Sequence, residues 1–174
     1  MVGSMAVPGV AQATPPVEND HYEDAFTGSF DDCGFTITYD VTTSGHFMSR
    51  EVEGSDGQAF LAQDNFEVRN VLTNPETGAF MVERGHGLFK ELSGRQIAGN
   101  IWEFTTHSIF NRVLEDSEGN IVARESGLVT SLVVFDTLGD GQPGGIVLEE
   151  EITGVHGPHP VFEGFCEIAT DLIG

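Results

Sequence analysis

Basic residues are scarce in this chain, and their scarcity excludes the first large class of partners. Lys and Arg total 7 of the 174 residues against 28 Asp and Glu, which gives a formal net charge of −21. Proteins that bind phosphate backbones gather Lys and Arg on one face, and anionic membrane surfaces make the same demand. We therefore expect no nucleic-acid partner. An acidic excess of this size is typical of proteins that stay soluble outside the cell or in salt.

Long apolar runs and the common catalytic motifs are also missing. No apolar stretch approaches the roughly 18 residues that a membrane-spanning helix needs, so the sequence predicts no span. The chain lacks the Gly-x-Ser-x-Gly, His-Glu-x-x-His, Cys-x-x-Cys, P-loop and Gly-x-Gly-x-x-Gly patterns. We therefore expect no cofactor, and the sequence leaves open whether the protein is an enzyme.

Phenylalanine and period-two alternation are what the chain has in abundance. It contains 13 Phe against 2 Tyr and 1 Trp. Apolar Phe35, Ile37, Tyr39 and Val41 alternate with polar residues, which is the pattern of a half-buried strand. Similar runs recur without an amphipathic helix between them. The sequence predicts an all-β fold, an antiparallel barrel of eight or nine strands, with a two-sheet β-sandwich as the alternative.

Turn residues divide the predicted strands. Strong loop signals are 74–78, 116–120 and the Gly-rich stretch 137–145. We also expect a turn at Ser44–Gly45, a bulge or bend at 85–87 and a break at Ser93–Gly94. The last segment, 161–168, is either a final strand or the start of a short helix.

The first thirty residues are interpreted as lying outside the folded domain. Residues 1–4 look like a cloning remnant, and Ala11-x-Ala13 has the small-x-small form of a signal-peptidase site. An ordinary Ala- and Pro-rich linker is the alternative. We predict a remnant, the tail of a signal peptide and a flexible arm over 1–30, and a single β-barrel domain over 31–174. The predicted location is secreted.

Two cysteines lie near the ends of that domain. Cys33 and Cys166 are 133 positions apart, and an even count agrees with export. We predict that they form a disulfide, with two separate buried thiols as the alternative. No cation adjoins Cys166 to lower its pKa, so a catalytic thiol is not expected.

Polar residues on otherwise apolar faces are the candidate site residues. If those faces point into a lumen, they line a ligand pocket, and a buried Glu or His there can act as an acid or base. The alternative places each at a barrel mouth or in an ion pair. The predicted ligand-binding residues are Phe35, Tyr39, Phe66, Arg84, His107 and Arg112, and the weaker catalytic candidates are Tyr39, Glu103 and His107.

Metal sites are considered and not assigned. His156 and His159 have a spacing that suits one ion, but no third ligand is evident. Asp136 and Asp140, followed by Glu149 to Glu151, do not match the spacing of a calcium loop. Two loop histidines and a plain Gly-rich turn are the expected readings, and calcium binding over 136–151 stays open.

Several stretches resemble a group of exported, uncharacterised β-rich proteins from actinobacteria. These are Asp31-Asp-Cys-Gly-Phe35, Val71-Leu-Thr-Asn-Pro-Glu-Thr-Gly78, Gly87-Leu-Phe-Lys-Glu91, Phe135-Asp-Thr-Leu-Gly-Asp140 and Phe165-Cys166. The resemblance covers most of 30–174 and implies export and a β-rich domain, but no catalytic residue. By architecture alone the chain is also similar to lipocalin and allene-oxide-cyclase-type barrels, an analogy that carries no function.

Three functions follow from this reading. The first is a secreted β-barrel that binds a small, largely apolar molecule in a Phe-rich lumen. The second is a cofactor-free cyclase or isomerase acting in the same lumen. The third is a structural or partner-binding extracellular protein with a filled core. The sequence predicts no oligomeric state.

Overall fold

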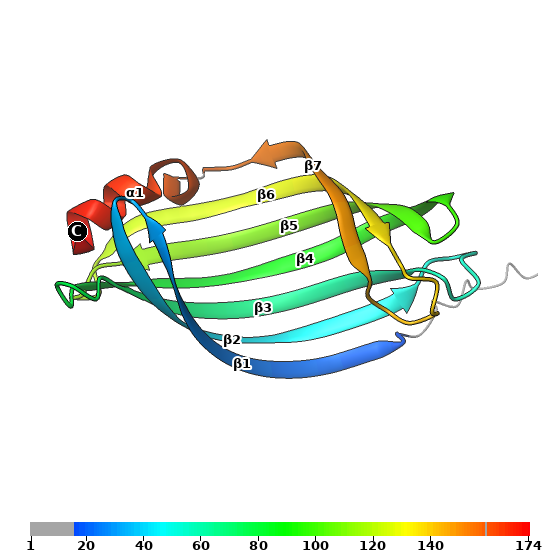
Figure 1. Ribbon diagram of the computed structural model, residues 1–174, viewed down its shortest axis with the longest axis horizontal. Helices are drawn as coiled ribbons and strands as arrows, with labels where there is room; N and C mark the ends of the chain where they lie inside the picture. The colour runs from blue at the N-terminus through cyan, green and yellow to red at the C-terminus, as the bar shows by residue number, and fades with distance from the viewer. Residues whose placement is uncertain (1–15, 159) are drawn as a thin grey trace, which may run out of the picture.

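The computed structural model describes residues 16–158 and 160–174, which form one antiparallel sheet and one helix (Figure 1). The described strands number seven, not eight or nine, and lie side by side in chain order. The all-β, antiparallel expectation is confirmed. The elements are β1 (Glu18–Asp32), β2 (Phe35–Glu51), β3 (Phe60–Thr73), β4 (Phe80–Ala98), β5 (Ile101–Glu115), β6 (Ile121–Asp136), β7 (Ile146–His156) and α1 (Pro160–Ile173).

The sheet curves into an open trough (Figure 1). Within the described residues β1 pairs with β2 and β7 pairs with β6, and the two end strands are not paired with each other. The sheet is therefore not closed into a barrel. Apolar side chains of alternate residues, such as Ile37, Leu72, Met81 and Phe104, are at most 3% exposed on the concave face. The opposite, convex face mixes polar residues with aliphatic ones such as Leu88, Ile109 and Val122.

Glycines on the concave face make room for aromatic rings from the neighbouring strand. A Cβ on Gly45 would lie 2.4 Å from the Tyr22 hydroxyl oxygen, and one on Gly87 would lie 2.6 Å from Cζ of Phe66. Such glycines also let a sheet bend sharply. The expected turn at Ser44–Gly45 is therefore wrong, because both residues lie inside the continuous strand β2, and residues 85–87 lie inside β4 without the register shift of a bulge. The expected break at Ser93–Gly94 is a register shift within β4.

The expected flexible arm is also wrong for its second half. Glu18–Asp32 is β1, and it pairs with β2 along its whole length, from Glu18 opposite Ser49 to Asp32 opposite Phe35. Its acidic side chains suggested an arm, but backbone pairing and alternate aromatic residues such as Phe30 hold the strand. The predicted cloning remnant and signal-peptide tail fall on residues 1–15, outside the described residues.

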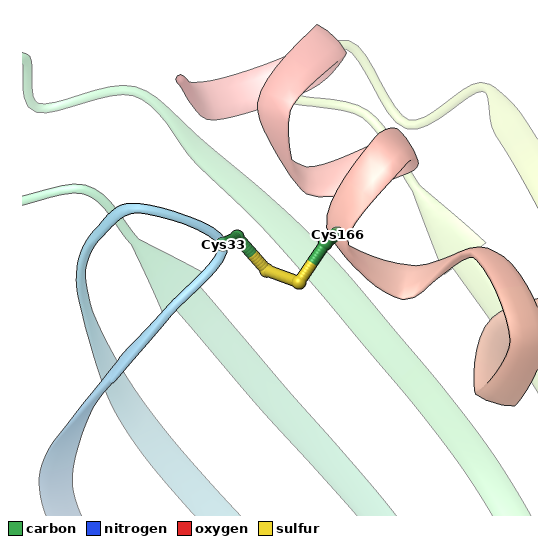
Figure 2. The surroundings of a disulfide bond; sticks show 2 residues. All are labelled: Cys33 and Cys166. Carbon is green, nitrogen blue, oxygen red and sulfur yellow. A yellow bond between two sulfur atoms is a disulfide. The ribbon is translucent and has the colours of Figure 1, made fainter.

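The β1–β2 turn is tied to the C-terminal helix. Cys33 and Gly34 both have positive φ (61° and 85°), as a two-residue type I′ hairpin requires. Figure 2 shows the Cys33–Cys166 disulfide, whose Cα atoms are 4.8 Å apart. The predicted pairing is confirmed in the structure. It fastens α1 over one end of the trough.

Helix α1 closes that end by burying its apolar side. Ala169 and Ile173, at most 1% exposed, pack with Ile37, Met81 and Leu114 of the sheet. Buried Asn74, in the predicted 74–78 loop, donates its Nδ2 hydrogen to the Ile173 carbonyl over 2.8 Å. The helix is too short to cross a membrane, and the described residues hold no other helix that could.

The last strand, β7, is an exposed edge. Its pairing with β6 is interrupted by two register shifts, between Thr130 and Ser131 and between Val134 and Phe135. Three consecutive glutamates, Glu149 to Glu151, occupy its centre and are exposed. Bulges and charges of this kind are how natural sheets protect an edge.

Candidate functional site

A pocket of about 340 Å³ lies in the concave face, at the end of the trough away from α1. Inward side chains of β2 to β7 form its walls, and the β6–β7 connection contributes Thr137, Pro143 and Gly144 to its rim. Thus the Gly-rich stretch that the sequence marks as a loop borders the pocket. The strand residues that line it are Phe47, Ser49, Phe60, Ala62, Phe89, Glu91, Phe104, Thr106, Val133, Phe135, Val147 and Glu150.

Phenylalanine dominates the lining. Five rings come from five strands, and those of Phe104 and Phe135 meet edge to face with centroids 5.9 Å apart. Beside them on the concave face lies Trp102, the single tryptophan of the chain, packed with Val52 and Ala59. This apolar cluster packs against the rings of Phe104 and Phe135. The pocket surface is therefore preformed and apolar.

One ionisable side chain, Glu91, stands inside this apolar surface with a strongly altered proton affinity. Burial raises the pKa of Glu91 from 4.5 to about 7, and a hydrogen bond from the Ala62 backbone N–H to its Oε2 (2.6 Å) opposes that rise. A carboxyl group of this pKa is present in both protonation states near neutral pH. It can accept a hydrogen bond, pair with a cation or move a proton.

The neutral polar side chains of the pocket are largely engaged elsewhere. Ser49, 2% exposed, donates its hydroxyl hydrogen to Glu18 over 3.1 Å. Thr137 donates to the Asn100 carbonyl over 3.2 Å. Thr106 lies opposite Glu91 in the β4–β5 pairing and is 3% exposed. The carboxyl group is thus the main polar feature presented to a ligand.

The residues predicted from the sequence fall on both faces of the sheet, and none lines this pocket. Phe35, Tyr39, Phe66 and Arg112 lie at alternate positions of the concave face. Phe35 and Tyr39 pack at the end covered by α1. Arg84, Glu103 and His107 lie on the convex face, where Arg84 pairs with Glu115 (2.9 Å) and Arg95 pairs with Glu103 (2.6 Å).

Arg112 is the centre of an ion cluster in the middle of the trough. Its Nη1 lies 2.8 Å from Glu83 and its Nη2 lies 3.0 Å from Glu125. Glu125 is 1% exposed, and the guanidinium also lies 5.3 Å from the centre of the Phe110 ring. Both carboxylates and the ring occupy Arg112, so we interpret the cluster as structural.

Tyr22 of β1 and Asp64 of β3 form another polar contact on the concave face. The Tyr22 hydroxyl donates to Oδ2 of Asp64 over 2.9 Å. Burial, and then the neighbouring Asp64 carboxylate, raise the pKa of Tyr22 to about 12. Tyr22 therefore stays protonated under ordinary conditions and acts as a hydrogen-bond donor.

The metal candidates gain no support from geometry. Asp136 accepts hydrogen bonds from Asn100 and from the Leu138 backbone, as a turn residue does. His156 is exposed, and His159 lies outside the described residues. Nowhere in 16–158 or 160–174 do three His, Cys, Asp or Glu gather closely enough to hold an ion.

Glu91 is the residue that sequence reasoning missed. Its signal is the alternation Gly87, Phe89, Glu91, which puts a carboxyl group on the same face as an aromatic ring. In the sequence, Gly87–Glu91 is one of the stretches that carry the resemblance to exported actinobacterial proteins. Comparison with family models, curated proteins and solved structures finds no match to this chain.

Proposed function

We propose that the chain binds a small, largely apolar molecule in the pocket at the open end of the trough. The observation that carries the proposal is the 340 Å³ cavity lined by five Phe rings. Sites for small molecules occupy roughly 300–1,000 Å³ and have this apolar character with few polar groups. A core filled solid, as the structural alternative requires, would leave no such cavity.

The open sheet and the disulfide fit this proposal. On this proposal the sheet is an incomplete barrel. Its end strands β1 and β7 do not pair with each other, which leaves the trough accessible to a ligand. Export is part of the same proposal. A disulfide that joins distant parts of the chain suits an oxidising compartment, and the resemblance to exported actinobacterial proteins points the same way.

The test is a titration with N-phenyl-1-naphthylamine, an uncharged apolar dye that fluoresces in dry sites. We expect saturable binding of one dye per chain, and a change in Trp102 fluorescence, because Trp102 packs against the lining residue Phe104. Ala62→Phe, which fills the pocket, should weaken binding at least about tenfold, since a second ring occupies the same volume. Ala25→Phe adds the same ring at an exposed residue of β1 and should change nothing.

Circular dichroism of each variant shows whether the fold survives. If Ala62→Phe does not fold, Phe89→Ala takes its place, because it removes lining surface without overfilling the pocket. Dye binding that fails to saturate, or that weakens equally in both Ala→Phe variants, refutes the proposal.

A second function is favoured by one observation, the pKa of Glu91 near 7. A carboxylate with that pKa in an apolar pocket suits a general base. The cofactor-free isomerase would take a proton from the carbon between a carbonyl and a double bond and return it at the far alkene carbon, which conjugates the two groups. The assay is conversion of 3-cyclohexenone to 2-cyclohexenone, followed by absorbance. Loss of the rate in Glu91→Gln supports this function, and a wild-type rate equal to buffer alone removes it.

A further inference from the structure

We infer that the ligand of this pocket is a hydrophobic amine, a molecule with an aromatic or branched aliphatic body and one protonated nitrogen. The inference rests on the proposed function and adds the charge of the ligand to it. It comes from the way that the sheet places almost all basic side chains on its convex face, which leaves the acidic side chains of the concave face largely unbalanced, together with the placement of Glu91 among Phe rings.

Basic side chains are almost confined to the convex face. The chain has seven Lys and Arg residues, all in strands, and the strand registers place Arg112 alone on the concave face. Arg112 is already paired with Glu83 and Glu125. The six on the convex face are Arg50, Arg69, Arg84, Lys90, Arg95 and Arg124.

Acidic side chains, by contrast, lie on both faces of the sheet, and the convex face carries Glu67, Glu103, Glu115 and Glu149 among others. The difference between the faces is the balance of charge: Arg112 alone offsets the acidic residues that the registers place on the concave face, which are Glu18, Asp20, Asp24, Asp32, Glu51, Asp64, Glu83, Glu91, Glu125 and Glu150. Summed charge of one sign along a groove attracts the opposite ion and raises its local concentration. The trough therefore favours cations and repels anions, including fatty-acid carboxylates that would otherwise suit an apolar pocket.

The lining of the pocket itself also has acidic but no basic side chains among the described residues. Its lining includes Glu91 and, at the exposed edge, Glu150, while no described lining residue is Lys, Arg or His. Phe rings attract cations through their π faces, so an ammonium group is compatible with the rings as well as with the carboxylate. A neutral ligand would use the rings and leave Glu91 without a partner of opposite charge.

A metal ion is the other cation that a carboxylate could attract, and the geometry opposes it. In the part of the chain that the structure describes, no three His, Cys, Asp or Glu gather around one point. A single half-buried carboxyl group among Phe rings cannot supply the several oxygen ligands that calcium or magnesium requires. The complementary cation is therefore an organic one with an apolar body.

The charges around Glu91 determine how binding depends on pH. Four acidic residues lie on its own face nearby: Glu18 of β1, hydrogen-bonded to Ser49, Glu51 of β2, Asp64 of β3 and Glu150 of β7. By register Lys90 on β4 and Arg50 on β2 belong to the opposite face, where a separate hollow of about 150 Å³ is lined by both of them and also reaches Glu91. No basic group on the concave face at this end of the sheet competes with a ligand amine. An ammonium beside Glu91 stabilises its ionised form, so amine binding should strengthen as pH rises through 7.

The experiment compares three ligands of one shape, 4-phenylbutylamine, 4-phenylbutanol and 4-phenylbutyrate, as competitors of N-phenyl-1-naphthylamine at 150 mM salt. At pH 8 we expect the amine to bind about tenfold more tightly than the alcohol, as a charge-assisted hydrogen bond implies, and the acid to bind most weakly. At pH 5.5, where Glu91 with its pKa of about 7 is mostly protonated, the amine-to-alcohol ratio should fall toward one.

Two variants assign the preference to its residue. Glu91→Gln should abolish the amine-to-alcohol ratio at pH 8 and its pH dependence. Glu149→Gln removes the same charge from the convex face of β7 and should leave the ratio intact. If the three competitors bind equally, or if Glu149→Gln lowers the ratio as much as Glu91→Gln, the inference is overturned while dye binding still supports the pocket. If the dye itself does not bind, the proposed function fails and the inference fails with it.

Discussion

Replacing Glu91 by Gln should make the fold more stable at pH 8 and hardly change it near pH 4.5. The folded-state pKa of Glu91 is about 7, against 4.5 for the free group, so the folded state holds this proton more tightly than the unfolded chain. The destabilising effect of the carboxyl is therefore absent below pH 4.5. It grows as pH rises toward 7 and is constant above that.

The size of the effect follows from the same two values. At about 1.36 kcal/mol per pKa unit the full shift corresponds to about 3 kcal/mol. Water at the pocket rim screens part of it, and we expect a gain of about 1–3 kcal/mol at pH 8. The Gln side-chain oxygen still accepts the hydrogen bond from the Ala62 N–H, so that contact does not change between the two proteins.

Urea unfolding at pH 5, 6, 7 and 8, followed by Trp102 fluorescence, measures the difference. The gain from Glu91→Gln should increase with pH while the slope of the transition stays the same. Glu149→Gln, which removes an exposed charge, should show no such trend. A gain that is equal at all four pH values, or largest at pH 5, would refute the assignment of a raised pKa to Glu91.

Three further predictions concern the scaffold. Cys33→Ser removes a cross-link between residues 133 positions apart and should lower the urea midpoint, with a loss of up to about 5 kcal/mol from the chain-entropy relation; reduction of the wild-type protein should have the same effect. Gly87→Ala should lower the free energy of unfolding by about 2 kcal/mol, measured by thermal unfolding, because the new methyl group meets Phe66 at 2.6 Å and a backbone oxygen at 2.8 Å. Gly164→Ala is the control: its methyl group has no atom within 4 Å, so stability should change by less than about 0.5 kcal/mol. Glu125→Ala should cost about 3 kcal/mol, because it removes a carboxylate that is 1% exposed from the Arg112 cluster, and the measurement is again urea unfolding.

The fold class, the disulfide and the main loops are legible in the sequence because each has a local cause. Period-two alternation indicates strands, and the Asn-Pro-Glu-Thr-Gly and Asp-Ser-Glu-Gly-Asn stretches specify turns by their own chemistry. The turn predicted at Gly45 is wrong because, in the sequence, a glycine that ends a strand cannot be distinguished from a glycine that lies under a neighbour's ring, as Gly45 and Gly87 do. Only the partner strand, with Tyr22 or Phe66 opposite, tells them apart.

The candidate site is harder to predict because alternation gives two faces without saying which is concave. Arg84 and Arg112 both share a face with apolar neighbours, yet the β4–β5 register puts Arg84 on the convex face and Arg112 on the concave one. A shift of one residue exchanges the faces. Just after Glu91 such a shift occurs in β4 itself, between Glu91 and Ser93. Assigning Glu91 to the pocket therefore needed the long-range pairing of six strands.

The irregular edge of β7 has a consequence for how the molecule behaves in concentrated solution. Its aliphatic residues Ile146, Leu148 and Ile152 are more than half exposed, which would ordinarily invite another chain to add as the next strand. The two register shifts interrupt the hydrogen-bond ladder, so a second copy of the chain finds no regular edge to pair with. The three adjacent glutamates also repel an equally acidic copy. The β7 edge therefore disfavours fibre growth, and the trough can stay open without adding strands from other copies of the chain.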